Sequence, residues 1–580
     1  MGWLYDFVDP TPDQKDQRRR TIDLFALVAH YSALVPALVF VALRLARRLS
    51  RRLAVSAPTA RSPSYHQVPR SPLAKAHRHE ASSLLAARWL RLQWWLSDNL
   101  SIARIDCGRR YQWALGLAWT AWLLLLCFLA TDYLHLTKRF GAIAVSQLPI
   151  QQLLALKALN PFAWAFCSSH ETLNSLHRLL GRIIYGLVLV HALLYNYYFL
   201  VTAIWLKRFF ALVVFCGVIA FGLITALIIT STSSIRALSY RLFFITHIVS
   251  ALLIPLLIFV HAPSARLYLV ETLIVYFLDR ALRTATAVTS PATIHPVPGT
   301  SLVKISLALP ARKLARFAAA PGSHVYLSIR LDTLPQDQGA WSLFTFLFLY
   351  NPFTLASVDQ IKNTLTLVAR VRSGPMTTTL ACYASSSNPS PAHGQLSLTL
   401  DGPYGAMTHL LDNLLRWGAA RVLFFAGGVG ATFIFPVYRA LQAESPSAKT
   451  QLIWAVRGAA DVACALPDSS AASSILRDKN LDLFITRESD MVQESENTPG
   501  GAVEMTAIPP SDNSPLVSKP HHQRPDIKQI VNDAFRQGTE ERIAILVCGP
   551  ADMAKTLRQS VRPWVMRGRQ VWWHDENFAW

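Results

Sequence analysis

The sequence predicts a polytopic α-helical membrane domain followed by two soluble domains, a small antiparallel β-barrel and a doubly wound α/β domain. Hydrophobic residues make up 52% of the 580 residues and charged residues only 16%, which is unusual for a wholly soluble protein. The apolar excess lies in the first half of the chain. Beyond it, short alternating strands broken by Pro and Gly are followed by buried strands that alternate with helices.

Membrane-spanning helices need about 20 predominantly apolar residues. The sequence contains about seven such stretches, at roughly 22–43, 111–131, 147–166, 176–200, 209–230, 242–262 and 267–283. From Arg44 to Arg110 there are fourteen Lys or Arg and three acidic residues. This clustering is typical of a cytosolic loop, so we expect the N-terminus outside and the soluble domains in the cytosol.

The net charge of +21 is concentrated in this loop, so it indicates membrane lipid rather than nucleic acid as a partner. The seven cysteines include no CxxC pair, so neither a disulfide framework nor a zinc site is expected. We expect four segments: 1–110 (first span and basic loop), 111–283 (membrane domain), 284–410 (β-barrel) and 411–580 (α/β domain). Residues 489–525, rich in Ser, Pro, Asn and Glu, are expected to be a disordered insertion.

Two apolar spans each carry two histidines fourteen residues apart, His177 and His191 on one, His247 and His261 on the other. Fourteen residues rise about 21 Å and fall only about 40° short of four full turns. Each pair therefore lies on one helix face, and parallel helices would place His177 opposite His247 and His191 opposite His261. One membrane histidine alone is explained as well by a hydrogen bond at a helix end. The repeated spacing favours paired ligands.

Paired neutral imidazoles at matched depth are what six-coordinate haem iron requires. The two levels would therefore hold two b-type haems within a four-helix core. Zinc is the alternative metal, but no cysteine or acidic residue is placed to complete a tetrahedral site.

A glycine-rich turn separates a strand from a helix in the segment RVLFFAGGVGATFIFPVYRAL (421–441). Gly427, Gly428 and Gly430 would let backbone N–H groups and the helix N-terminus approach a pyrophosphate. A tight structural turn explains the glycines equally well when the motif is considered alone.

The chain from about residue 110 to its end resembles the fungal ferric reductases, which are relatives of the NADPH oxidases. The paired histidines with the intervening HRLLGR are similar to the bis-haem helices of that family. Three segments resemble its FAD-binding motifs: NPFTLAS (351–357), RSGPMTTTL (372–380) and DGPYG (401–405). AGGVGAT (426–432) and CGP (548–550) resemble its NADPH-site motifs, and HDENFAW (574–580) resembles the aromatic tail that covers the flavin ring.

The resemblance implies a ferredoxin-reductase-like unit and assigns roles to individual residues. Residues implied to bind FAD are Asn351, Pro352, Phe353, Thr354, Ser357, Gly374 and Thr377. Those implied to bind NADPH are Gly427, Gly428, Gly430, Thr432, Gly549 and Pro550. Cys548 would lie beside the nicotinamide, and Phe578 or Trp580 would stack on the flavin. The structural alternatives are core packing for Phe353, a simple turn for DGPYG and a buried structural thiol for Cys548.

Asn351 departs from the family pattern, which usually has histidine at this position. An amide can replace one imidazole donor but does not titrate near neutral pH, so FAD affinity or flavin potential is expected to differ.

The implied function is electron transfer from cytosolic NADPH through FAD and two haems to an extracellular ferric or cupric chelate, in the plasma membrane. A superoxide-forming oxidase, with oxygen as acceptor, is the first alternative. A non-catalytic membrane protein with an impaired flavin site is the second. A metal-uptake protein is a candidate partner.

Overall fold

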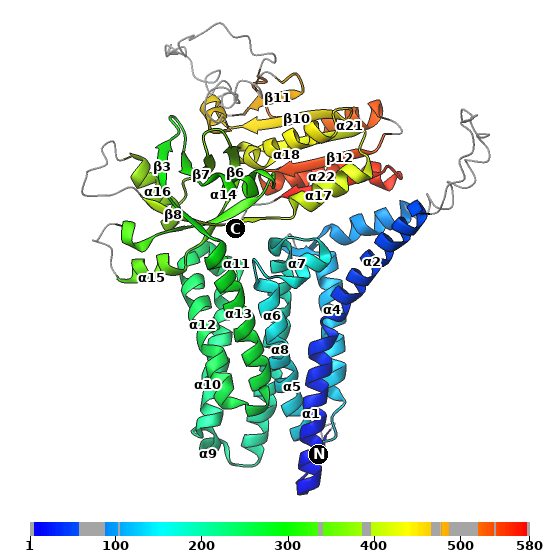
Figure 1. Ribbon diagram of the computed structural model, residues 1–580. Helices are drawn as coiled ribbons and strands as arrows, with labels where there is room; N and C mark the ends of the chain where they lie inside the picture. The colour runs from blue at the N-terminus through cyan, green and yellow to red at the C-terminus, as the bar shows by residue number, and fades with distance from the viewer. Residues whose placement is uncertain are drawn as a thin grey trace, which may run out of the picture. The chain divides into compact units, whose positions relative to one another are not determined.

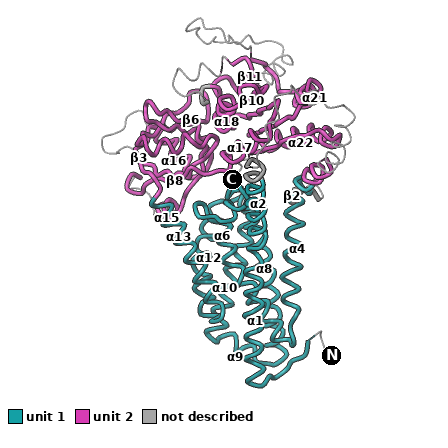
Figure 2. Tube along the Cα trace, turned by 45° about the vertical axis from the view of Figure 1, so that its right-hand side comes forward, with its two compact units in different colours: residues 1–68, 96–285 teal, residues 69–95, 286–580 magenta. Residues whose placement is uncertain are grey.

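The computed structural model describes residues 5–56, 87–102, 105–334, 340–385, 396–465, 476, 478–486, 520–538 and 541–576. The chain forms two compact units (Figure 2). The first comprises residues 1–68 and 96–285, and the second comprises residues 69–95 and 286–580.

The first unit is a helical bundle with one β-hairpin, β1 (Asn99–Ile102) and β2 (Ile105–Arg109) (Figure 1). Its helices are α1 (Pro12–Ser32), α2 (Val35–Ser56), α4 (Arg110–Phe128), α5 (Tyr133–Ser146), α6 (Leu148–Ala155), α7 (Pro161–Phe166), α8 (His170–Val201), α9 (Trp205–Phe209), α10 (Leu212–Thr230), α11 (Ser233–Leu238), α12 (Tyr240–His261) and α13 (Arg266–Thr286).

Five helical stretches in the described residues are long and apolar enough to span a membrane: Pro12–Ser50, Arg110–Phe128, His170–Val201, Leu212–Thr230 and Tyr240–His261. The predicted span at 267–283 corresponds to helix α13, which carries Glu271, Asp279, Arg280 and Arg283 and is not among the five.

The bounds predicted for the third span, 147–166, are wrong. Helix α6 ends at Ala155, and α7 begins at Pro161 after Asn160 caps it by accepting a hydrogen bond from the N–H of Ala163. Proline at the first helical position and an asparagine cap start a new helix rather than continue the old one. The long helical pass in this region is instead α5 followed by α6, which meet at Gln147.

Helix α8 packs one apolar face into the core of the first unit. Its buried residues recur at helical spacing: Leu173, Leu180, Ile184, Leu187 and Leu194. They pack with side chains of α4 and α5, and Tyr133 of α5 donates a hydrogen bond to the carbonyl of Leu194 (2.9 Å). This packing fixes the rotation of α8, and so the direction in which its histidines point.

The first domain of the second unit is a closed barrel with strand order β3-β4-β7-β6-β5-β8. Its neighbouring strands are antiparallel, as the sequence predicted. The strands are β3 (Val288–Pro296), β4 (Leu302–Ala308), β5 (His324–Ile329), β6 (Asn351–Asp359), β7 (Thr364–Arg370) and β8 (Ser397–Tyr404). Alternate residues, among them Leu365, Leu367, Leu398 and Leu400, fill the interior, as the two-residue period of a strand requires. Helices α14 (Ala311–Ala318), α15 (Ala340–Phe348) and α16 (Pro375–Ser385) connect strands.

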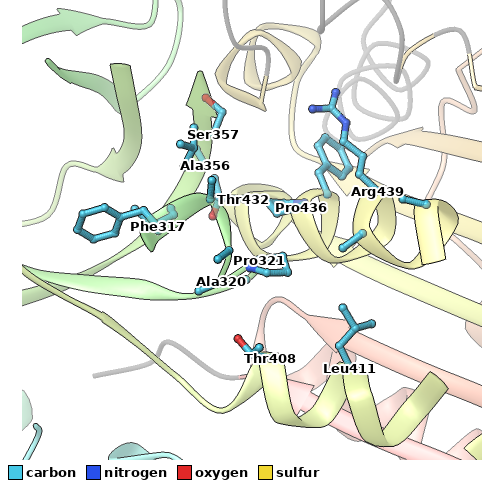
Figure 3. A pocket seen from close by; sticks show the side chains of 18 of the residues that line it. Phe317, Ala320, Pro321, Ala356, Ser357, Thr408, Leu411, Thr432, Pro436 and Arg439 are labelled. Carbon is cyan, nitrogen blue, oxygen red and sulfur yellow. The ribbon is translucent and has the colours of Figure 1, made fainter. Parts of the chain in front are cut away.

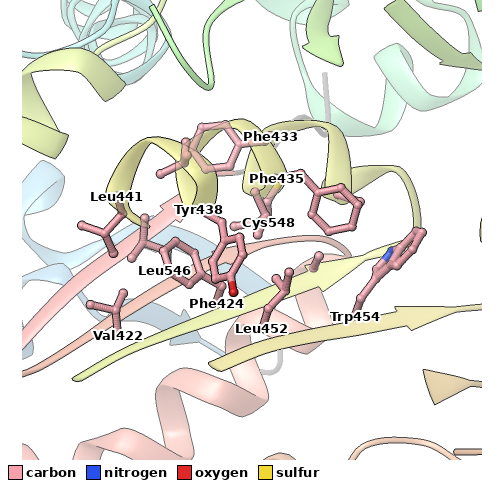
Figure 4. Close-up of a cluster of buried hydrophobic side chains, with 14 of the residues drawn as sticks. Val422, Phe424, Phe433, Phe435, Tyr438, Leu441, Leu452, Trp454, Leu546 and Cys548 are labelled. Carbon is pink, nitrogen blue, oxygen red and sulfur yellow. The ribbon is translucent and has the colours of Figure 1, made fainter. Parts of the chain in front are cut away.

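The second domain of this unit is a five-stranded parallel sheet of order β11-β10-β9-β12-β13. Its strands are β9 (Arg421–Gly427), β10 (Lys449–Val456), β11 (Leu481–Ile485), β12 (Ile543–Cys548) and β13 (Val571–Glu576), and its helices are α17 (Met407–Trp417), α18 (Ala431–Glu444), α21 (Ile527–Gln537) and α22 (Ala551–Met566). Val422, Phe424 and Leu546 pack against α18 on one face (Figure 4). The alternate residues Leu423 and Phe425 pack with α21 and α22. Both faces are therefore covered, which confirms the doubly wound fold.

Two sequence expectations concern the edges of this sheet. Most of the predicted insertion, 489–519, lies outside the described residues. His521, near its end, exchanges backbone hydrogen bonds with Leu483 and Ile485 of β11. The tail motif HDENFAW begins inside strand β13, so its first three residues belong to the sheet.

Candidate functional site

The structure brings the fourteen-spaced histidines of α8 and α12 together in pairs. The imidazole centroids of His191 and His261 lie 6.3 Å apart with their planes at 88°. His177 and His247 are close enough to interact electrostatically. The pairing is the one that the spacing predicted.

Three of the four imidazoles are oriented by a backbone carbonyl. Nδ1 lies 2.9 Å from the carbonyl oxygen of Gln151 in His177, 2.7 Å from that of Thr137 in His191 and 2.7 Å from that of Val213 in His261. A carbonyl only accepts, so Nδ1 carries the proton and Nε2 keeps the lone pair that a metal needs. In His177 that nitrogen lies 3.3 Å from the side-chain amide nitrogen of Gln151, which donates to it and would have to move aside for a metal. Nδ1 of His247 is buried and has no hydrogen-bond partner among the described residues.

Glycines on the neighbouring helices make room for the His191 and His261 rings. A Cβ on Gly141 of α5 would lie 2.7 Å from Cε1 of His191, and a Cβ on Gly217 of α10 would collide with the ring of His261. In both helices the glycine lies four residues after the residue whose carbonyl accepts from the histidine. The same backbone device therefore seats both rings of this pair.

The described residues contain no group of three or more His, Cys, Asp or Glu that could hold a metal. The donor set therefore fits iron in a porphyrin better than zinc.

A cluster of like charges lies near the His177–His247 pair. Arg178 and Arg182 of α8 interact electrostatically with each other, and Arg178 also interacts with Arg236 of α11. None of the three forms an ion pair with an acidic side chain in the described ranges, and Nε of Arg236 is buried without a hydrogen-bond partner. Arg178 and Arg182 are exposed and Arg236 is half-buried. A cluster of guanidinium groups without acidic partners favours an anion, and the carboxylates of a haem would fit this role.

The predicted flavin motif is the first part of strand β6. Pro352 pairs with Tyr326 and Thr354 with His324 of β5, and Thr354 is buried. Phe353 is partly buried and packs against the barrel core, so core packing accounts for part of its role. His324 was not among the residues predicted from the sequence, although it pairs with Thr354 of the motif in the strand register.

The segment RSGPMTTTL forms a turn and the start of α16. The Thr377 hydroxyl donates to the carbonyl of Arg372 (2.8 Å) and accepts from its N–H (3.1 Å), so it closes the turn. A Cβ on Gly374 would meet nothing within 4 Å. The backbone before this eleven-residue helix is therefore open toward the helix N-terminus, where backbone N–H groups can donate hydrogen bonds to a phosphate.

DGPYG is not a simple turn. Asp401 to Tyr404 complete strand β8, and the Tyr404 hydroxyl donates to Oδ1 of the buried Asp401 (2.6 Å).

The glycine turn after β9 and the CGP turn after β12 pack directly against each other. A Cβ on Gly427 would lie 2.5 Å from Cδ of Pro550, a Cβ on Gly549 would lie 3.0 Å from Cα of Gly427, and a Cβ on Gly430 would collide with the carbonyl of Cys548. Strands β9 and β12 are neighbours, and the chain leaves β9 toward β10 and β11 before it returns to β12. The two motifs therefore meet at the topological switch point, where nucleotides bind to such sheets.

Cys548 ends strand β12 and is 2% exposed. Burial raises the pKa of its thiol well above the usual range, so the group is a neutral thiol at physiological pH. Glu576 pairs with Cys548 in the sheet register. Phe578 and Trp580 lie outside the described residues, but the chain that leads to them leaves the sheet beside Cys548.

Thr432 and Ser357, assigned to different cofactors, line one cavity of about 580 Å³ (Figure 3). Ala320 and Pro321 of the barrel and Arg439 of α18 also line it. The Thr432 hydroxyl donates to the carbonyl of Val429 (2.8 Å), which rigidifies the glycine turn.

Comparisons with known proteins cover the same three regions. Residues 140–258 match the family model described as ferric reductase like transmembrane component, 289–408 match an FAD-binding domain, and 419–562 match the ferric reductase NAD binding domain. The chain is 25% identical over 450 residues to the probable metalloreductase AIM14 of Meyerozyma guilliermondii, covering 75% of this chain and 84% of that protein. It is 22% identical over 477 residues to ferric/cupric reductase transmembrane component 2 of Schizosaccharomyces pombe, covering 76% of this chain and 80% of that protein. The chain belongs to the fungal ferric reductase family, as a transmembrane oxidoreductase with an FAD-binding and an NAD-binding domain.

Proposed function

We propose that this protein is an NADPH-dependent ferric-chelate reductase, which moves electrons across the membrane to a ferric or cupric chelate outside. The observation that carries the proposal is the pairing of four histidines, three of which have Nδ1 fixed by a carbonyl. When bound, FAD would convert hydride into single electrons, and b-type haems at the two histidine levels would relay them across the bilayer.

The histidines act by binding and orienting. His177 with His247, and His191 with His261, would each present two Nε2 lone pairs to one iron. Iron held by two imidazoles at each level would be suited to passing electrons rather than to binding a further ligand. The names of two relatives, a metalloreductase and a ferric/cupric reductase, support a metal chelate as the acceptor.

The soluble unit would hold the donor and the flavin. Gly427, Gly430 and Gly549 let two backbone turns approach each other and a pyrophosphate. The Cys548 thiol, at the end of β12, would contact the nicotinamide as a neutral group. The Thr354 hydroxyl would donate a hydrogen bond to the flavin. Asn351 would supply an amide N–H donor where the family usually has an imidazole.

The basic stretch from Arg44 to Arg110 supports an orientation with the N-terminus outside and the soluble unit in the cytosol. We propose the plasma membrane as the location, since an exported electron must reach an extracellular chelate.

Difference spectroscopy of the purified protein under argon tests the proposal. Dithionite is expected to give a b-type haem spectrum, NADPH is expected to reproduce it, and ferric chelate is expected to reoxidise it faster than oxygen does. His261→Ala is expected to lose part of the haem, whereas His409→Ala, on the exposed side of α17, keeps all of it. A protein without haem overturns the proposal, and faster reoxidation by oxygen with release of superoxide assigns an oxidase.

A further inference from the structure

The residues 87–97, ARWLRLQWWLS, form a helix within the loop that the sequence marked only as basic. One side of this helix is part of the nucleotide-binding domain. Trp94 is 4% exposed and belongs to the same buried cluster as Phe425 and Val547 of the central strands. Leu90, one turn earlier, packs against that cluster too.

Trp94 is held by specific contacts. Its ring lies 5.6 Å from that of Trp573 of β13 in an edge-to-face arrangement. The guanidinium of Arg558 on α22 lies 4.2 Å above the Trp94 ring, 5.5 Å from the Trp573 ring, and donates to the carbonyl of Trp94 (3.2 Å). The guanidinium lies close to both rings, and its cation–π attraction adds to the stabilisation that the rings gain from burial. This face of the helix is therefore firmly docked.

The opposite side of the helix presents a second apolar face. At about 100° per residue, Trp89, Leu92 and Trp95 centre roughly 180° away from Leu90 and Trp94. These three side chains are 60%, 45% and 48% exposed. Arg91 lies beside Trp95 at one edge of this face, Arg88 lies within it, and both are exposed. An apolar stripe of Trp and Leu that carries arginine is the composition of helices that lie in a membrane interface.

The C-terminal end of the helix is tied to a membrane span. The N–H of Arg110 donates to the carbonyl of Asp98 (3.0 Å), and β1 pairs with β2 through Asn99 and Arg109. Arg110 is the first residue of α4, one of the candidate spans. The hairpin therefore returns the chain, so that Asp98, directly after the helix, lies beside the first residue of α4.

We propose that helix 87–97 binds an anionic lipid surface through Trp89, Leu92 and Trp95, with Arg88 and Arg91 on the headgroups, while its other face holds the nucleotide-binding domain. The helix is then a two-sided tether between that domain and the membrane surface. A lipid surface fits better than a protein because the stripe is short, carries two arginines and ends next to a candidate span. The negative sign of the lipid rests on the proposed cytosolic orientation.

Photocrosslinking of the full-length protein in nanodiscs tests this proposal without requiring haem, flavin or activity. With p-benzoylphenylalanine in place of Trp89 or Leu92, we expect lipid adducts, more in phosphatidylserine-containing discs than in phosphatidylcholine alone. Leu90 lies on the docked face and is the matched control. With p-benzoylphenylalanine at this position, we expect crosslinks within the chain to the nucleotide-binding domain. Arg88→Glu with Arg91→Glu is expected to remove the preference for phosphatidylserine, roughly fivefold in occupancy for each arginine lost.

The proposal is overturned if positions 89 and 92 crosslink to a second copy, to another protein or to this chain, while position 90 still reports the docked face. Hydrogen exchange of residues 87–97 in intact unsubstituted protein gives a second readout. Equal protection in anionic and zwitterionic discs would overturn the assignment to anionic lipid.

Discussion

The two histidine pairs of the membrane unit are built differently. The His191–His261 pair is seated twice by the same backbone device, a carbonyl acceptor followed four residues later by a glycine beneath the ring. At the His177–His247 pair only His177 has a carbonyl partner, and three arginines gather nearby. One level is therefore defined by close packing and the other by charge. Substitutions should therefore affect them in different ways.

The largest effect is expected from Gly217→Ala. The new Cβ would collide with the His261 ring, and a rigid helix backbone cannot move away cheaply. We expect loss of haem at the His191–His261 level only, so that about half of the haem remains. Haem per chain, measured by pyridine haemochrome, checks this result. Gly222→Ala on the same helix, where a Cβ meets nothing within 4 Å, is the control, and an unchanged haem content in Gly217→Ala would contradict the packing argument.

Gly430→Ala should instead affect both levels equally. The added Cβ would push the glycine turn away from the carbonyl of Cys548 and misplace the nucleotide, and small misplacements cost on the order of 100-fold in rate. We expect NADPH to reduce neither level at the normal rate, while dithionite still reduces both. Gly458→Ala, with open space at its Cβ, is the matched control. Slowed reduction of one level alone would argue against a shared donor site.

Arg236→Gln should shift only the His177–His247 level. Removal of a nearby positive charge destabilises the reduced, less positive state of a redox centre, by on the order of 1 kcal/mol for a partly buried charge. The midpoint potential of that level is expected to fall by tens of millivolts, with haem content unchanged. Spectroelectrochemical titration resolves the two levels. Arg266→Gln, whose guanidinium contacts Phe259, is the control, and an equal shift of both potentials would refute the assignment of charge to one level.

Hydropathy predicted the apolar spans because that signal is local, and it failed where a charged side chain is buried against partners from other helices. Helix α5 was missed because it contains His135, Lys138 and Arg139. Arg139 is nevertheless 1% exposed, since it donates to the carbonyl of Leu126 and lies 3.9 Å from the ring of Phe25. The sequence contains no sign of those contacts, which form only when three helices pack together.

The histidine site shows the same contrast between local sequence signals and long-range contacts. The histidine spacing is a property of single helices, so the pairing could be predicted from the sequence. The carbonyls of Gln151, Thr137 and Val213 carry no side-chain signature, and Gly141 and Gly217 gain meaning only from the rings against them. Docking of Trp94 between Arg558 and Trp573 joins residues more than 460 positions apart, and no local pattern predicts it.

Cys548 differs from the histidine levels because it is a buried thiol whose charged neighbour is the Glu576 carboxylate. Burial raises the pKa of its thiol in the folded protein, whereas the unfolded thiol keeps a pKa of about 8.5. Above that pH the unfolded state releases a proton that the folded state retains, so folding stability falls as pH rises, by up to about 1.4 kcal/mol per pH unit. Cys548→Ser is expected to flatten this fall, and Cys382→Ser, at an exposed cysteine, is expected to leave it unchanged. Urea unfolding of the intact protein from pH 7 to 10 measures both slopes. Equal slopes for Cys548→Ser and the parent would mean that the thiol ionises in the folded state, and it would then be available to react beside the nicotinamide rather than only to contact it.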